Sequence, residues 1–282
     1  GGSHGFGGGG FGGGHGFGGG FPGGAGGFGG GHRQQNQQPT ELFPKGKSKV
    51  VKLGKPKFPD SNSKHLWLIM FYSSEDAASH EVAETVETLA KKSVFKVGAI
   101  DCSHPREESF CSTKLPENKN HFPQFALVVD GKVTLHETPQ NVNAQGLHDF
   151  VVEHIPKSLV QNINHKSQIT DRLLASSKLG AILLLSEKYD TSTLYYSLAY
   201  QFRSTYSFGE SRAKNLNLAK EFGAKKYPML VAFVQKGLGT EKYDNNYDII
   251  RYLGSVQQKQ VTKWLNDTTK LIKKRERGGT GL

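Results

Sequence analysis

The residues with the clearest potential for redox or metal chemistry are the two cysteines of the chain, Cys102 and Cys111. A structural zinc site usually has four ligands, and His104 and His121 do not stand at metal-binding spacing from them, so no metal site is predicted. Three interpretations remain open: a disulfide, two free buried thiols, or a displaced redox pair. A bridge would close a loop of about ten residues, contribute on the order of 2–3 kcal/mol, and indicate an oxidising compartment.

A second candidate site is the segment FYSSEDAAS, residues 71–79, which follows an apolar run at residues 66–70 and precedes a helical pattern. Asp76 or Ser79 can accept a hydrogen bond from the first turn of that helix. His80 follows Ser79 without an acidic partner at a spacing that would define a catalytic triad, so a hydrolase is not predicted.

These residues belong to an expected unit of alternating strands and helices. A strand at 66–72, a helix and a strand at 95–101 form a parallel βαβ unit. A tight turn at Asp130-Gly131-Lys132 joins two further strands into a hairpin. The remaining elements of this half are a short helix at 107–114, the hairpin strands at 124–129 and 133–136, and a helix at 144–155.

The second half repeats the order in outline, which predicts a second unit of the same class. Its expected elements are helices at 169–176, 194–203, 216–222 and 256–270, and strands at 181–186, 206–209, 229–234 and 249–253. We therefore predict an α/β protein with two tandem mixed sheets flanked by helices. The predicted organisation is a glycine/phenylalanine-rich segment and linker at 1–40, domains at 41–157 and 158–272, and a basic tail at 273–282.

The glycine-rich segment and the net charge limit the kinds of partner that can be expected. The first 32 residues contain 21 glycines interrupted by phenylalanines, and such a tract is predicted to be disordered. The net charge of +11 gathers in the linker and the tail, a pattern that can indicate RNA binding. The tract lacks repeated arginines, so no nucleic-acid partner is expected. The chain has no apolar run of roughly 18 residues, so no membrane span is expected, and any targeting peptide is expected upstream of Gly1.

Several stretches in this order resemble the thioredoxin fold as protein disulfide isomerases use it. In the first half they are the apolar strand with FY, then KVGAIDC and FPQFALVVDGKV; in the second half they are YPMLVAF and YLGSVQQKQVTKWLND. The similarity covers roughly residues 45 to 270.

The resemblance carries implications for the site. Active relatives have Cys-x-x-Cys where this chain has Asp76, Ala77, Ala78 and Ser79, and the corresponding turn at 186–193 also lacks cysteine. The resemblance thus implies a redox-inactive protein that is not an enzyme and needs no cofactor. It further implies cis-prolines at Pro123 and Pro228. Two alternatives remain open for these prolines: a retained polypeptide-binding role, or a role in shaping the loop alone. The polypeptide-binding residues it implies are Phe71, Tyr72, Phe122 and Pro123.

The glycine/phenylalanine tract resembles the region that follows the J domain in DnaJ-type co-chaperones. That resemblance implies a J domain upstream, a heat-shock chaperone of the seventy-kilodalton class as partner, and unfolded client polypeptides. Together with the sequon Asn266-Asp267-Thr268 it favours the endoplasmic reticulum lumen. The alternatives are a thiol oxidoreductase that uses Cys102 and Cys111, a structural scaffold, and an RNA-binding protein.

Overall fold

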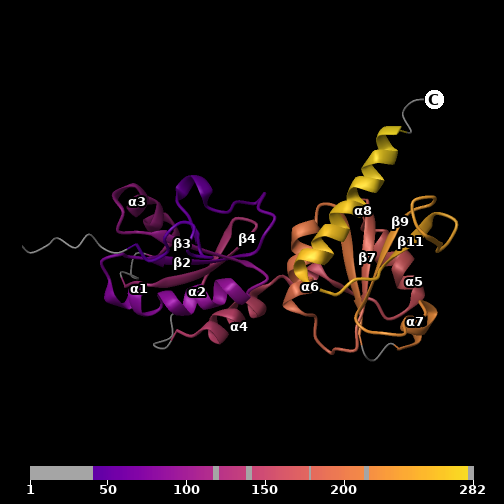
Figure 1. Ribbon diagram of the computed structural model, residues 1–282, viewed down its shortest axis with the longest axis horizontal. Helices are drawn as coiled ribbons and strands as arrows, with labels where there is room; N and C mark the ends of the chain where they lie inside the picture. Colours follow the sequence, from indigo (N-terminus) through magenta and orange to yellow (C-terminus); the bar gives the residue numbers. More distant parts are fainter. Residues whose placement is uncertain (1–40, 117–120, 138–141, 178, 213–215, 279–282) are drawn as a thin grey trace, which may run out of the picture. The chain divides into compact units, whose positions relative to one another are not determined.

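The computed structural model describes residues 41–116, 121–137, 142–177, 179–212 and 216–278, and it contains two separate mixed β-sheets (Figure 1). The predicted disordered segment at residues 1–40 lies outside these ranges. None of the helices in the described ranges has the length and apolar composition that crossing a bilayer would require.

The first sheet has the strand order β1-β3-β2-β4-β5. Its strands are β1 (Val51–Lys52), β2 (Trp67–Tyr72), β3 (Lys96–Asp101), β4 (Gln124–Val129) and β5 (Lys132–Leu135). β1, β3 and β2 are parallel, whereas β4 runs antiparallel to both β2 and β5. The turn between β4 and β5 places Asp130 and Gly131 at positive φ, as a tight hairpin requires.

Helices cover both faces of this sheet. The helical segments between residues 55 and 159 are η1 (Lys55–Lys57), α1 (Ala77–Glu81), α2 (Ala83–Lys92), α3 (Pro105–Lys114), α4 (Ala144–His154) and η2 (Lys157–Leu159). Along β2, Leu68 and Met70 pack in the same cluster as residues of α2 and α4, whereas Ile69 and Phe71 pack in the cluster that contains Cys111 of α3. A strand covered on both faces reads as a continuous apolar run, which is the pattern seen at 66–72.

The second sheet has the order β10-β11-β9-β7-β8-β6. Its strands are β6 (Gln161–Asn162), β7 (Gly180–Leu185), β8 (Tyr206–Ser211), β9 (Met229–Gln235), β10 (Glu241–Lys242) and β11 (Tyr247–Tyr252). β6, β8 and β7 are parallel, and β9, β11 and β10 continue the sheet antiparallel. Each half thus has a central strand between a parallel and an antiparallel neighbour, which confirms the predicted pair of mixed α/β units.

The helices of the second half are α5 (Lys166–Gln168), the π-helix η3 (Ile169–Leu174), α6 (Thr193–Phe202), α7 (Leu216–Glu221) and α8 (Gln258–Gly278). α8 continues well beyond its expected end at 270, so the basic residues Lys273–Arg277 are helical and do not start a separate tail. The physical reason is Ile272, which is 1% exposed and packs in the core, so it holds the last turns of the helix in place.

Candidate functional site

The turn that follows β2 is built around a helix cap instead of a thiol. Asp76 has extended backbone angles, and its Oδ1 accepts a hydrogen bond from the backbone N–H of Ala78 at 3.0 Å. Ser79, at the position of the second cysteine of active relatives, is completely buried, and its Oγ accepts a long bond from Ser73 N–H at 3.4 Å. At the two positions that the resemblance assigns to cysteines, the structure thus has the carboxylate of Asp76 and the hydroxyl of Ser79.

Serine hydroxyls and one carboxylate connect this turn to the end of β3. The hydroxyl of Ser103 donates to Asp101 Oδ1 at 2.6 Å and lies 3.0 Å from the hydroxyl of Ser74. His80 Nε2 lies 2.8 Å from the carbonyl oxygen of Ser74, to which it donates, so the imidazole does not act on a serine hydroxyl. The network fixes the turn and contains no nucleophile–base pair among these residues.

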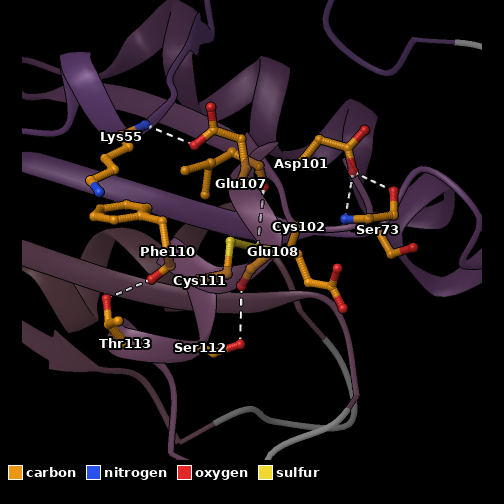
Figure 2. Close-up of a disulfide and its surroundings, with 12 residues drawn as sticks. Lys55, Ser73, Asp101, Cys102, Glu107, Glu108, Phe110, Cys111, Ser112 and Thr113 are labelled. Carbon is orange, nitrogen blue, oxygen red and sulfur yellow. Dashed lines mark hydrogen bonds between the residues drawn. A yellow bond between two sulfur atoms is a disulfide. The ribbon is translucent and has the colours of Figure 1, made fainter. Parts of the chain in front are cut away.

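Cys102 and Cys111 form a disulfide that joins the residue after β3 to α3, with 5.8 Å between their Cα atoms (Figure 2). Both cysteines are buried, at 5% and 3% exposure. The same cluster contains Phe58, Phe71 and Phe110, with the rings of Phe58 and Phe110 packed edge to face. Of the three interpretations that the sequence left open, the structure contains the disulfide.

The expected polypeptide-binding residues of the first half do not form an exposed surface. Phe71 is 0% exposed and Tyr72 is 3% exposed, because β2 is central and helices cover both its faces. Pro123 is also buried, and Phe122 is half-buried against the cluster around the disulfide. The assignment of an accessible binding surface to Phe71, Tyr72 and Pro123 is therefore wrong.

The two cis-prolines differ sharply in exposure. The bonds Phe122–Pro123 and Tyr227–Pro228 are both cis and stand directly before β4 and β9, respectively. Pro123 is buried, whereas Pro228 is exposed. Of the two cis-prolines, only Pro228 is therefore accessible to a ligand.

Pro228 lines a pocket of about 410 Å³ in the second half. The wall is mainly apolar and comes from β7, α6, β9 and the segment before α8: Leu184, Leu194, Tyr195, Leu198, Leu230 and Val256. Ser186, at the end of β7, belongs to the lining and starts the turn that corresponds to residues 73–79. The pocket thus lies where the first half has its degenerate turn, and a concave apolar site of this size fits side chains of a bound chain.

A buried carboxylate holds the loop at the mouth of this pocket. Glu210 is 1% exposed, accepts a hydrogen bond from the hydroxyl of Thr191, and pairs with Arg212 at 3.3 Å. Arg212 also donates to Thr191 Oγ1 at 2.8 Å and to the carbonyl of Tyr189 at 3.1 Å. Burial and the neighbouring Glu210 raise the pKa of Tyr195 well above its ordinary value, so this phenol is neutral. Its hydroxyl donates to the carbonyl of Gly209 at 2.7 Å.

Sequence reasoning missed Glu210 and the pocket that it borders, since the strand was expected to end at Gly209. A signal was present, because Glu210 stands two residues before Arg212, and a carboxylate and a guanidinium at this spacing can form a buried pair. Within the described ranges, no cluster of three His, Cys, Asp or Glu side chains could hold a metal ion.

The fold and these sites define a class of protein. Two mixed sheets flanked by helices, each with a helix after the central strand and a cis-proline before the adjacent antiparallel strand, are thioredoxin-like units in tandem. No family model matches the chain.

Comparison with known proteins relates the chain to two groups. It is 25% identical over 173 residues to the DnaJ protein ERDJ3A of Oryza sativa subsp. japonica, which covers 58% of this chain and 29% of that protein. It is 23% identical over 232 residues to a Dictyostelium discoideum protein assigned by name to the protein disulfide-isomerases, covering 79% of this chain and 53% of that protein. The chain therefore spans between about a third and a half of these relatives.

Among solved structures, the crystal structure of ERdj5 form I superposes with a TM-score of 0.53 at 18% identity, covering 78% of this chain and 29% of that chain. This likeness concerns the fold. The comparisons confirm the predicted relation to DnaJ-type and protein disulfide-isomerase-like proteins with thioredoxin-like domains.

Proposed function

We propose that this chain is a polypeptide-binding module of a co-chaperone and that it assists protein folding without thiol chemistry of its own. The observation that carries the proposal is the exposed cis-Pro228 beside an apolar pocket of about 410 Å³. An edge of this kind can receive an extended chain, and the pocket can receive one of its side chains. The binding site is therefore proposed in the second half, at Pro228.

The absence of dithiol exchange is part of the proposal. Asp76 and Ser79 replace the cysteines of active relatives, and the turn after β7 has none. The two cysteines of the chain, Cys102 and Cys111, are bonded to each other and buried. A reactive cysteine is usually accessible and activated by a nearby positive charge or a helix N-terminus, so these features support a structural role for the disulfide.

The proposed partners follow from the related proteins. The similarity to a DnaJ protein supports cooperation with a heat-shock chaperone of the seventy-kilodalton class through an upstream J domain. Unfolded client polypeptides would be the ligands. The disulfide supports an oxidising compartment, and with the relatives it supports the endoplasmic reticulum lumen.

Binding of a permanently unfolded polypeptide tests the proposal. Fluorescein-labelled, carboxymethylated lactalbumin is titrated with the full chain, and saturable binding is expected. Leu194→Glu and Val256→Asp each place a charge in the apolar lining, so each is expected to weaken binding at least about ten-fold. Leu271→Glu, at an exposed position of α8, is the matched control and keeps wild-type affinity.

Circular dichroism and urea unfolding check that each variant is folded before its binding is compared with that of the wild type. Absence of saturable binding by the folded wild-type chain would replace the proposal with a structural scaffold. Equal loss in the control and in the pocket variants would move the binding surface away from Pro228.

A further inference from the structure

Pro228 separates two hollows of different electrostatic character. The second hollow, of about 560 Å³, shares Pro228 with the apolar pocket and none of its other lining residues. Its lining combines apolar and basic residues: Phe222, Lys225, Lys226, Met229, Arg251 and Leu253. Leu253 is 92% exposed, so the rim presents an apolar side chain that solvent almost fully surrounds. An extended chain that crosses Pro228 would contact both hollows.

The rim of the second hollow has unbalanced positive charge. Lys225 and Lys226 are exposed, and neither forms an ion pair within the described part of the chain. Arg251 differs, because its guanidinium forms two hydrogen bonds to Glu241, at 2.6 and 2.9 Å. These bonds lower the pKa of Glu241, so the pair is charged and mutually neutralised. The two lysines therefore leave a net charge of +2 on this side.

The rim of the apolar pocket has the opposite balance. Glu187, Lys188 and Asp190 line it, are exposed, and sum to −1. Glu210 adds no net charge, because Arg212 pairs with it. The charge thus changes sign across Pro228, from −1 beside the apolar pocket to +2 beside Lys225 and Lys226.

We propose that the surface around Pro228 selects extended polypeptide segments that have an apolar residue with acidic residues next to it on one side. The acidic residues can stand before or after the apolar residue in the sequence of the segment. The apolar side chain occupies the pocket lined by Leu184, Leu198 and Leu230, and the acidic residues lie over Lys225 and Lys226. The selection rests on the proposed polypeptide-binding function and adds a ligand chemistry to it. Complementary rim charges act mainly on specificity and on the rate of association, and salt weakens them.

Three synthetic peptides test the selection on the full chain. The three peptides share one apolar core and differ in a pair of residues at one end, which is two glutamates, two lysines or two serines. Each pair is placed first at the N-terminal end and then, in a second set, at the C-terminal end. At low salt we expect the acidic peptide to bind about five-fold more tightly than the serine peptide, and the lysine peptide to bind more weakly than both. At 0.5 M salt the three affinities are expected to converge.

Charge reversal tests whether Lys225 and Lys226 cause the selection for acidic segments. The double variant Lys225→Glu/Lys226→Glu is expected to invert the order of the acidic and lysine peptides. The matched control, Lys273→Glu/Lys274→Glu, changes the same charge at two adjacent exposed residues of α8 and is expected to keep the wild-type order.

The outcomes separate this inference from the function on which it rests. If all three peptides bind equally and Lys225→Glu/Lys226→Glu changes nothing, the selection for acidic segments is wrong while polypeptide binding stands. If the control inverts the order as well, the effect comes from net charge, and the inference is wrong. If no peptide binds at any salt concentration, the proposed function itself fails.

Discussion

The carboxylate of Asp76 caps the helix that begins at Ala77, with its Oδ1 3.0 Å from the backbone nitrogen of Ala78. In relatives with a dithiol, the first cysteine occupies this helix N-terminus, where the same N–H groups favour a thiolate. In this chain the carboxylate of Asp76 accepts a hydrogen bond from one of the N–H groups at the helix start and offers no nucleophilic sulfur.

Replacing Asp76 tests this capping role. Asp76→Ala removes the acceptor for Ala78 N–H and is expected to lower the free energy of unfolding by about 1 kcal/mol, whereas Asp76→Asn keeps an acceptor oxygen and loses only part of that. Urea unfolding at neutral pH measures both variants. Equal stability of wild type and Asp76→Ala would show that the cap contributes nothing.

Removing the disulfide tests whether it is structural. The bridge links residues nine apart in sequence, and Cys102→Ser/Cys111→Ser is expected to lower the free energy of unfolding by on the order of 2–3 kcal/mol. Reduction of insulin by the wild-type chain is expected at background level and unchanged in the double variant. An insulin-reducing activity that disappears with the two cysteines would instead establish the chain as a thiol oxidoreductase.

The buried phenol of Tyr195 gives a prediction at high pH. Tyr195→Phe removes the hydroxyl that donates to the carbonyl of Gly209 at 2.7 Å and lies 3.2 Å from the carbonyl of Ile182, so it is expected to cost about 1 kcal/mol below pH 10. Because the folded-state pKa of Tyr195 is raised, its stabilising contribution is fully present below the ordinary value of 10 and decreases as pH rises beyond it. The stability difference between wild type and variant should therefore shrink above pH 10 by about 1 kcal/mol per pH unit.

Urea unfolding at pH 8, 10 and 10.8 measures this difference, and the other tyrosines and the lysines contribute to both proteins alike. A difference that is constant over this range would mean that Tyr195 ionises in the folded protein as readily as in the unfolded chain.

The apolar runs and the turns made most of the fold predictable. The run at 66–72 reads as a buried strand because both faces of β2 are covered, and the Asp130–Lys132 turn has the residues that a tight hairpin needs. The end of α8 was missed because a run of five mostly basic residues is typical of a solvated tail. The buried Ile272, just before that run, decides the outcome, and its partners are distant in sequence.

The site was harder to predict for a related reason. The pairs Phe122-Pro123 and Tyr227-Pro228 have the same local chemistry, an aromatic residue followed by a cis-proline, yet only Pro228 is exposed. The exposure of each proline depends on side chains from other segments that pack over it. The residues next to the proline in sequence do not indicate which side chains these are. The burial of Glu210 likewise depends on Thr191, 19 residues away in sequence.

The turn after β7, which borders the pocket at Pro228, also determines how a bound client would leave. A thiol in that turn could trap a substrate cysteine as a mixed disulfide, and release would then require a second thiol or a reductant. Residues 186–193 contain no cysteine, so under the proposed function the residence time of a client depends on reversible contacts alone. The cysteines of that client would stay available to separate oxidoreductases throughout the encounter.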